Sequence, residues 1–216
     1  MLSGSAMKSN KDYRWYNVNW FRRMALVYDY VEFLLGDLRK KVANKINDSN
    51  LRILDVACGT GNQSIAFARR GFSVVGIDMS PDMLKYANKK KKPFYKIKFI
   101  CKDATEIPYQ DSSFDVSSIS FGLHDMPEEI AIKILKEMIR TTKKNGEIII
   151  VDYYTPRKGF SSLLGHKIVK TWETKNYDHF RKVGLGHYLN QVNLKQFSKE
   201  SHLIGNMQIV VCQNIK

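Results

Sequence analysis

Two glycines and a downstream aspartate have the spacing of a nucleoside-binding turn. Residues 51–56 form a short apolar run that predicts a strand, and it leads into a small-residue turn with Gly59 and Gly61. Glycine has no Cβ, so a ligand can lie close to this backbone, and the helix that follows turns its unpaired N–H groups toward the same place. A second predicted strand, 73–77, ends at Asp78, whose carboxylate is suited to bind both hydroxyls of a ribose.

The residues around the two glycines indicate which nucleoside fits. A dinucleotide fingerprint has a third glycine, at the position that Ser64 occupies here. Asp55 lies at the end of the first strand, and a buried carboxylate beside the turn would repel a pyrophosphate. It would favour a ligand with positive charge, such as the amino group and sulfonium of S-adenosylmethionine (SAM).

The sequence D-x-A-x-G-x-G at residues 55–61 resembles the first motif of class I SAM-dependent methyltransferases, with Ala57 in place of the usual first glycine. Residues 20–29, WFRRMALVYD, resemble the F-x-x-x-A-x-x-Y-D segment of the ubiquinone/menaquinone-biosynthesis C-methyltransferases. Further segments resemble later motifs of class I: VVGIDMSPDMLKYAN (74–88), Lys102-Asp103-Ala104, DSSFDVSSISFGLHDMP (111–127) and KKNGEIIIVDYYTP (143–156).

This resemblance implies a set of residues that contact the cofactor. Asp78 would bind the ribose, and Asp103 would accept a hydrogen bond from the adenine amino group. The expected set is Tyr28, Asp55, Ala57, Cys58, Gly59, Thr60, Gly61, Asp78, Met79, Met83, Asp103, Ala104, Ser120 and Phe121. We expect no metal, because the acidic clusters are assigned to the cofactor. Cys58 has the alternative roles of a small packing residue and a reactive thiol, of which packing is favoured.

Methyl transfer from a sulfonium needs alignment and exclusion of water, and it needs a base only where the nucleophile must lose a proton. His124 follows the fourth predicted strand and is the candidate base or hydrogen-bonding partner of the acceptor, with a loop or cap role as the alternative. Asp152 and Tyr153 end the fifth strand and are secondary candidates, since Asp152 can instead cap backbone groups. His179, together with Glu173, is a further candidate for the acceptor pocket.

Strands alternate with helices along the chain, which predicts a parallel sheet with helices on both faces. With the resemblance, we expect an α/β, Rossmann-like, seven-stranded, mostly parallel sheet with an antiparallel last strand at 207–212. Asp55, Asp78, Asp103 and Phe121 fall at the carboxyl ends of strands, where such sheets bind ligands. The predicted parallel strands are 51–56, 73–77, 97–101, 114–120 and 147–153.

Two helices have clear boundary signals. Ser80 as N-cap and Pro81 at the first position predict a helix over 81–90. The next helix is expected to open with an acidic capping box at Asp125-Met126-Pro127-Glu128, and to end at Asn145-Gly146.

Composition favours one domain over residues 1–216, with 44% hydrophobic residues. We expect residues 13–46 to form a helical lid and residues 157–206 a substrate-side insertion. The sequence has no apolar run near 18 residues, which predicts no membrane span, and its first residues lack the apolar centre of a secretory signal. Three widely spaced cysteines (Cys58, Cys101 and Cys212) predict reduced thiols, no zinc and a cytoplasmic location.

The net charge of +14 is compatible with a nucleic-acid partner or with solvated lysines. The densest basic run, 89–92, follows a predicted helix, where cations favour the helix end, so nucleic acid is not the favoured partner. We therefore expect a SAM-dependent methyltransferase, monomeric or homodimeric, acting on a small molecule that is quinone-like, aromatic or lipid-like. The alternatives are an RNA-directed methyltransferase, a non-catalytic SAM-binding regulatory protein and a nicotinamide-dependent oxidoreductase. The residues after Tyr28-Asp29 lack the Asn, Ser and Arg-Trp pattern of the quinone enzymes, which leaves the acceptor open.

Overall fold

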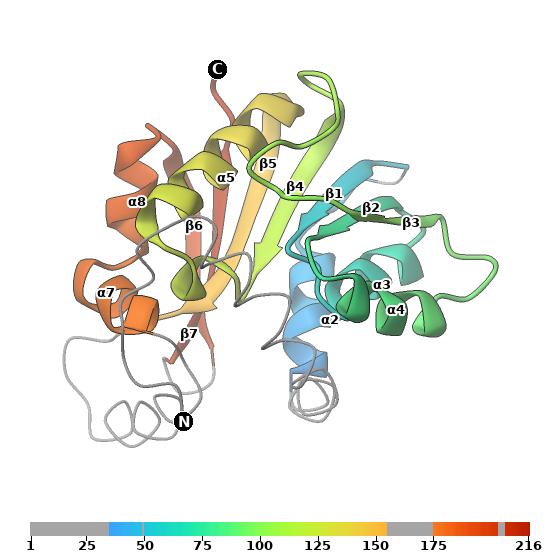
Figure 1. Ribbon diagram of the computed structural model, residues 1–216. Coiled ribbons are helices and arrows are strands. Elements are labelled where there is room, and N and C mark those ends of the chain that lie inside the picture. Colours follow the sequence, from blue (N-terminus) through green and yellow to red (C-terminus); the bar gives the residue numbers. More distant parts are fainter. Residues whose placement is uncertain (1–34, 49, 155–174, 203–205) are drawn as a thin grey trace, which may run out of the picture.

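The computed structural model describes residues 35–48, 50–154, 175–202 and 206–216 (Figure 1). In it, seven strands form one sheet in the order β3-β2-β1-β4-β5-β7-β6. The strands are β1 (Arg52–Val56), β2 (Ser73–Asp78), β3 (Ile97–Cys101), β4 (Phe114–Ser120), β5 (Thr142–Tyr153), β6 (Lys195–His202) and β7 (Met207–Gln213). The first five strands are parallel to one another, and β7 is antiparallel to both β5 and β6. The predicted Rossmann-like sheet with an antiparallel last strand is confirmed.

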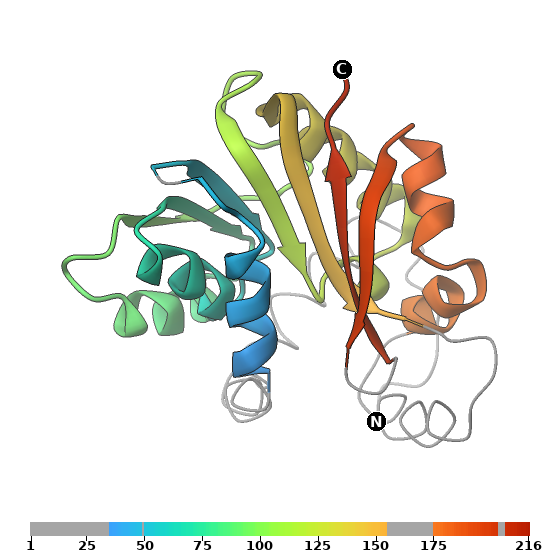
Figure 2. The ribbon, with the colours of Figure 1, turned by 180° about the vertical axis from the view of Figure 1, so that it is seen from behind.

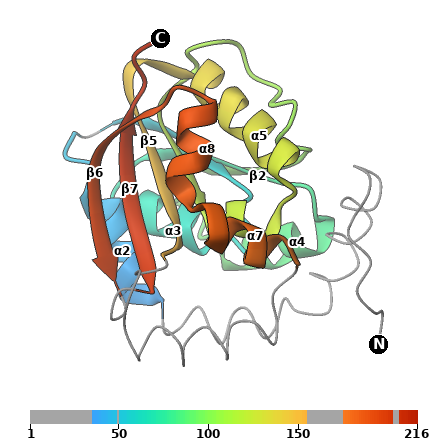
Figure 3. The ribbon, with the colours of Figure 1, turned by 90° about the vertical axis from the view of Figure 1, so that its left-hand side faces the viewer.

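Helices cover both faces of this sheet, as Figures 2 and 3 show. One face carries α2 (Gly36–Asn44), α3 (Asn62–Arg69) and α4 (Pro81–Lys90), and the other carries α5 (Glu128–Thr141), α7 (Lys175–Val183) and α8 (Leu185–Gln191). Alternate residues of β1 belong to different cores: Ile53 packs with α2 and α3, while Leu54 and Val56 pack with α5 and α8. Because side chains alternate along a strand, Asp55 shares the face of Ile53 and points toward α2 and α3.

The start of α4 is as predicted. The backbone N–H of Met83 donates to the Ser80 hydroxyl over 3.3 Å, and Pro81 is the first helical residue. A proline is well tolerated there because the first N–H groups of a helix have no partner within the helix. This cap fixes the chain directly after Asp78, at the carboxyl end of β2.

Both predicted boundaries of α5 are wrong. Asp125 belongs to a short 3-10 turn, η1 (Leu123–Asp125), and α5 begins after Pro127 with no side-chain cap. The helix ends at Thr141, not at Asn145-Gly146. The reason lies at Thr142, whose hydroxyl donates to the Met138 carbonyl over 2.6 Å and lies 2.6 Å from the Ser117 hydroxyl of β4.

Asn145 and Gly146 lie within β5, at an irregularity in its pairing with β4. Asn145 has a φ of 63°, and a Cβ on Gly146 would lie 2.5 Å from the carbonyl oxygen of Asp115. A side chain at residue 146 would therefore force the two strands apart. The Asn-Gly pair marks a tight strand contact instead of a helix end.

The expected insertion at 157–206 contains an unpredicted strand. Its described part forms α7, α8 and then β6, which pairs with β7 at the edge of the sheet. Nearly all side chains of β6 are exposed or half-buried, so the strand lacks the alternating apolar pattern that marks a half-buried strand in sequence. Of the expected lid at 13–46, only α2 and the residues beside it are described, and Tyr28 lies outside the described residues.

Within the described ranges, none of the helices has both the length and the apolar character that a membrane crossing requires.

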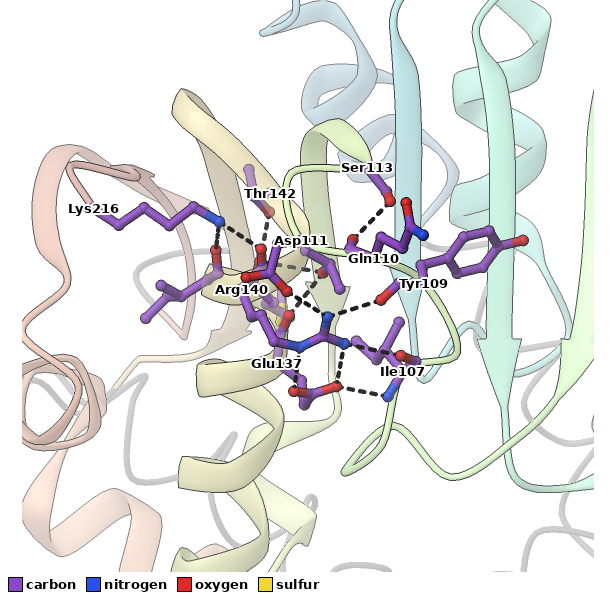
Figure 4. A network of polar contacts seen from close by, with 12 residues as sticks. Ile107, Tyr109, Gln110, Asp111, Ser113, Glu137, Arg140, Thr142 and Lys216 are labelled. Carbon is purple, nitrogen blue, oxygen red and sulfur yellow. Dashed lines mark hydrogen bonds and ion pairs between the residues drawn. The ribbon is translucent and has the colours of Figure 1, made fainter.

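The loop from β3 to β4 is held against the C-terminal end of α5 by Arg140 (Figure 4). Its guanidinium donates to both carboxylate oxygens of Glu137 over 2.7 and 2.8 Å, and to the carbonyls of Ile107 and Tyr109 over 2.9 and 2.8 Å. Asp111 accepts a further bond over 2.9 Å. Hydrogen bonds to Arg140 lower the pKa of Glu137, so this pair stays ionised. The network fixes the loop that follows Asp103.

Candidate active site

Gly59 and Gly61 lie in the turn between β1 and α3, and they serve different purposes. Both have left-handed backbones, with φ of 53° and 79°. A Cβ on Gly59 would meet no atom of the described residues within 4 Å, whereas one on Gly61 would lie 2.8 Å from the Phe99 ring and 2.9 Å from Ala87. Space for a ligand is therefore present at Gly59, while Gly61 is required for the packing of α3 against β3 and α4.

Asp78 is bonded to this turn. Its Oδ2 accepts from the backbone N–H of Gly59 over 2.8 Å, and its Oδ1 accepts from that of Ser80 over 2.8 Å. Burial raises the pKa of Asp78, and these backbone N–H groups act in the opposite direction. The carboxylate therefore joins the carboxyl ends of β1 and β2, and its role in binding a ribose stays a prediction.

Asp55 is almost completely buried, with 1% exposure, on the α2/α3 side of the sheet. Ser64, at the third glycine position of a dinucleotide fingerprint, donates its hydroxyl to the Asp55 carboxylate over 2.5 Å. Burial raises the pKa of Asp55 to about 6, opposed by the Ser64 hydrogen bond and by the charge of Arg39. Arg39, from α2, is itself buried and lies 5.2 Å from the centre of the Phe121 ring.

Several buried polar atoms near Asp55 find no hydrogen-bond partner among the described residues. They are Gln63 Oε1 at the start of α3, and the hydroxyls of Ser118 and Ser120 in β4. Ser118 is paired in register with Asp55, and Ser120 lies on the same face of β4 one pleat nearer the carboxyl end. Because buried polar groups are normally paired, this cluster has capacity for a polar ligand or for water. A zwitterionic ligand such as the amino acid part of SAM fits these donors and acceptors.

Asp103, which follows β3, is half-buried, and its Oδ1 accepts from both the N–H and the hydroxyl of Thr105 over 2.9 and 2.8 Å. Ala104 is buried beside it. The Thr105 bonds fix the orientation of the carboxylate at the same edge of the sheet as Asp78. The role of Asp103 in binding the adenine amino group stays a prediction.

The other residues of the turn are consistent with a tightly built loop. Ala57 has a φ of 50°, and the Thr60 hydroxyl accepts from the Asn62 side chain over 3.2 Å. The Cys58 thiol is buried, and desolvation together with Asp78 and Asp55 raises its pKa well above the ordinary value. Cys58 therefore stays protonated, in agreement with the packing role. Met83 is buried at the start of α4, and Met79 packs at the edge of the core.

At the end of β4, Phe121 has a φ of 54°, which is rare for a bulky residue. Its N–H donates to the Val151 carbonyl over 2.8 Å, which holds the strained conformation. The chain then turns into η1 and places His124 beside the end of β5. Strained backbone of this kind is typical of functional sites.

His124 is buried and paired with Asp152. Its Nδ1 lies 2.7 Å from Asp152 Oδ1, and the backbone N–H groups of Leu123 and His124 donate to Asp152 Oδ2 over 3.1 and 3.3 Å. The N–H of Tyr153 also donates to Asp152 Oδ1, over 2.8 Å. Asp152 thus caps backbone groups, which was one of its two predicted roles, and it also orients the imidazole.

His179 lies in α7 and is bonded to Glu128 at the start of α5. Its Nε2 is 2.6 Å from Glu128 Oε2, and the Nε2 of His187 is 2.8 Å from Glu128 Oε1. Both hydrogen bonds lower the pKa of Glu128. This cluster ties α7 and α8 to the first turn of α5, and Glu173 lies outside the described residues. Among the residues that the structure describes, no group of three or more His, Cys, Asp or Glu side chains is arranged to hold a metal ion.

The residues that sequence reasoning missed are Arg39, Gln63, Ser64 and Ser118. Polar residues within a buried parallel strand were the available signal for Ser118, because such strands are otherwise apolar. Ser64 was read as a missing glycine and not as a donor to Asp55. Arg39 gave no signal, since its burial depends on how α2 packs.

Known proteins are similar to this chain in sequence and in fold. Residues 53–146 match the family described as "Methyltransferase domain". A demethylmenaquinone methyltransferase of Renibacterium salmoninarum is 44% identical over 108 residues, which cover 50% of this chain and 44% of that protein. One of Staphylococcus aureus is 33% identical over 145 residues, covering 63% and 59% respectively. The chain thus spans about half the length of these curated relatives.

Solved structures show the same fold at low sequence identity. The 1,6-didemethyltoxoflavin-N1-methyltransferase of Burkholderia thailandensis, solved with S-adenosylhomocysteine, superposes with a TM-score of 0.74 at 12% identity, covering 99% of this chain and 94% of that one. Residues 53–146 therefore resemble a methyltransferase domain, and the fold of the chain is that of solved SAM-dependent methyltransferases.

Proposed function

We propose that this protein transfers a methyl group from SAM to a small, quinone-like aromatic acceptor. The observation that supports the proposal is the bond between Asp78 and Gly59, because a carboxylate suited to a ribose lies beside a glycine with open space next to it. The names of the relatives support the acceptor class, because they are demethylmenaquinone methyltransferases.

Each part of SAM has a matching group at this edge of the sheet. Asp78 would bind the ribose hydroxyls, and Asp103 would accept from the adenine amino group. The cluster of Asp55, Arg39 and Ser120 would hold the charged amino acid part. When bound, SAM supplies a methyl group attached to a positively charged sulfur. After transfer, that sulfur belongs to a neutral thioether, which is the leaving group.

The charges of the cluster suit this ligand better than a dinucleotide. A pyrophosphate beside Asp55 would be repelled once that carboxylate ionises, whereas an ammonium group would be attracted. Ser64 is committed to Asp55 and stands where the dinucleotide fingerprint has its third glycine, the one used for close packing of helix on strand. These observations favour SAM over a nicotinamide or flavin coenzyme.

Isothermal titration calorimetry tests the cofactor assignment directly. We expect the purified protein to bind SAM and S-adenosylhomocysteine, and to show no heat of binding with NAD. Methyl transfer is then measured with radiolabelled SAM and demethylmenaquinone, in its quinone and its reduced quinol form, with total RNA as the competing acceptor. Absence of S-adenosylhomocysteine binding, or label found in RNA alone, would contradict the proposed function.

A further inference from the structure

Half of the net charge of this chain lies in about one tenth of its length. Residues 81–102, which form α4, the loop after it and β3, contain eight lysines and one aspartate, a net charge of +7 against +14 for the whole chain. β3 is an edge strand, and the loop between α4 and β3 projects from that edge of the sheet (Figures 1 and 2). The positive charge is therefore gathered at one corner of the molecule.

Most of these lysines face solvent without a compensating charge. Lys90 is half-buried and donates to the Asn62 side chain over 2.8 Å. The other seven are exposed and are called the basic surface here: Lys85, Lys89, Lys91, Lys92, Lys96, Lys98 and Lys102. In the part of the chain that the structure describes, none of these seven forms an ion pair with a carboxylate. Like charges this close repel one another, so an anionic partner would relieve an unfavourable interaction.

The C-terminal end of α4 accounts for only part of this charge. Lys89 and Lys90 lie in the last turn of the helix, where a positive charge is favourable. The helix ends at Lys90, and its effect on charges falls off within the last turn. The lysines of the loop and of β3 therefore have no role in stabilising the helix end.

An exposed aromatic ring stands among the lysines of the loop. Phe94 is 74% exposed, and it follows the exposed Pro93. The Nζ of Lys92 lies 5.9 Å from the centre of the Phe94 ring, and the Tyr95 ring packs against it edge to face at 4.8 Å. Most of this large apolar side chain is in water, so its burial against a partner would be favourable.

We propose that the basic surface and Phe94 dock this protein on the surface of a membrane that contains anionic phospholipids. Lysines close to such a bilayer are attracted to its headgroups, and clusters of about four to eight are typical of this kind of binding. An aromatic ring beside them can enter the boundary between headgroups and acyl chains. The proposal concerns where the protein is held, and it does not depend on the identity of the methyl acceptor.

Nucleic acid is the other polyanion that a basic surface could bind, and two observations favour the bilayer. Residues 71–139 contain no arginine, the side chain whose planar fork pairs with bases and phosphates. Lys89 and Lys92 lie over the rings of Tyr86 and Phe94, at 5.6 and 5.9 Å from the ring centres, and a base would need such ring faces for stacking. Lysines around a projecting aromatic ring suit a flat, anionic surface with an apolar interior.

Sedimentation with lipid vesicles tests the proposal on the full chain. One set of vesicles is made of phosphatidylcholine, and in the other about a quarter of it is replaced by phosphatidylglycerol, which is anionic. The test variant carries four substitutions in the basic surface: Lys89→Gln, Lys91→Gln, Lys92→Gln and Lys96→Gln. The control variant loses the same charge from exposed lysines of α5, β5 and β6: Lys133→Gln, Lys136→Gln, Lys144→Gln and Lys195→Gln.

A second pair of variants tests the aromatic ring. Phe94→Ser removes it from the basic surface. Phe197→Ser is the matched control, because Phe197 is 79% exposed but lies on β6, at the other edge of the sheet. Melting temperature is measured for every variant, and all should stay folded because the substituted side chains are exposed.

We expect the wild type to bind the anionic vesicles and not those of phosphatidylcholine alone, with weaker binding at higher salt. The test variant should lose at least about 100-fold in affinity for the anionic vesicles, since each lysine near the surface contributes about fivefold. The control variant should lose at most about threefold, because its charges lie away from the bilayer. Phe94→Ser should bind about fivefold more weakly than Phe197→Ser.

Three results would overturn the proposal. If the wild type does not sediment with anionic vesicles, the surface does not dock on membranes. If the test and control variants lose the same affinity, total charge drives the binding and not this surface. If the wild type ignores the vesicles but binds a single-stranded RNA, and the test variant alone loses that binding, the basic surface belongs to a nucleic-acid site.

Discussion

The carboxylate of Asp78 and the backbone N–H of Gly59 are joined by a 2.8 Å hydrogen bond between the end of β2 and the turn after β1. One side chain thus holds the glycine turn in place and presents the same carboxylate to a ribose. The turn and the carboxylate form a single unit, and substitutions in either should affect ligand binding through both.

Replacement of Asp78 by alanine should weaken S-adenosylhomocysteine binding by more than about tenfold, since each tenfold corresponds to about 1.4 kcal/mol. The loss has two parts, the ribose contacts and the support of the Gly59 and Ser80 N–H groups. Titration with S-adenosylhomocysteine and its 2′-deoxy form separates them. Wild type should discriminate between these two ligands, and Asp78→Ala should not; equal discrimination by both proteins would remove Asp78 from the ribose site.

Gly59→Ala should weaken S-adenosylhomocysteine binding more than it lowers the stability of the fold. Gly61→Ala should lower the stability of the fold more than it weakens binding. At residue 59 the added Cβ projects into open space, so the folded state bears mainly the cost of a left-handed alanine, about 1–2 kcal/mol. At residue 61 the same cost is joined by contacts of 2.8 and 2.9 Å with Phe99 and Ala87, which add about 1–3 kcal/mol.

Gly71→Ala is the matched control for these two variants, because Gly71 has a φ of 91° and open space around it, but lies at the other end of α3. It should lose stability as Gly59→Ala does and keep full ligand affinity. Urea unfolding and calorimetry measure the two effects. A Gly59→Ala protein that binds S-adenosylhomocysteine as tightly as Gly71→Ala does would show that no ligand approaches residue 59.

Asp55 should make the protein less stable as pH rises. Its pKa in the folded state is about 6, above the ordinary value of 3.8, so the folded protein binds the proton more tightly than the unfolded chain. The resulting stabilisation is complete below pH 3.8 and is lost as pH rises through about 6, an effect on the order of 3 kcal/mol.

Asp55→Asn should abolish this dependence, because asparagine has no proton to lose and can still accept from Ser64. Urea unfolding at pH 4.5 and 7.5 should therefore show the variant gaining stability relative to wild type at the higher pH. Its affinity for S-adenosylhomocysteine at pH 7.5 should fall, since the charge that favours the ligand's ammonium group is gone. A variant whose stability tracks wild type at both pH values would mean that Asp55 ionises with its ordinary pKa.

Arg140 should contribute more to the free energy of unfolding than an ordinary surface ion pair does. Its removal in Arg140→Met leaves the carbonyls of Ile107 and Tyr109 without their side-chain donor and leaves the ionised Glu137 with the Ile107 N–H but no cation, which we expect to cost about 2–3 kcal/mol. Lys143→Met is the control, because it breaks only a half-exposed pair with Asp115 and should cost at most about 1 kcal/mol. Thermal unfolding of both variants tests this, and equal losses would argue against a cooperative network.

Much of the fold could be predicted from the sequence because its signals are local. The strand, turn and helix around Gly59 lie within a few residues, and so does the Ser80 cap of α4. The end of α5 could not be predicted, because it depends on a hydrogen bond between Thr142 and Ser117 of the neighbouring strand β4, which holds Thr142 in β5. β6 was missed because its side chains are mostly solvated, so no apolar pattern marks it.

Some residues of the site could likewise be placed from local signals, and others could not. Asp78 and Asp103 could be placed from the rule that strand ends meet at one edge of a parallel sheet. The pairing of His124 with Asp152 joins residues 28 positions apart, and it depends on the register between β4 and β5. The Glu128 bonds to His179 and His187 span 51 and 59 positions and depend on how α7 and α8 pack. Contacts of this range require the folded structure.

The environment of Cys58 has a practical consequence for handling the protein. A thiol that stays protonated inside the turn reacts slowly with alkylating reagents and mild oxidants, whereas Cys101 is exposed at the end of β3. A maleimide dye should therefore label Cys101 ahead of Cys58. Because Cys101 is paired in register with Asp78, such a dye would report on ligand uptake without chemical damage to the glycine turn.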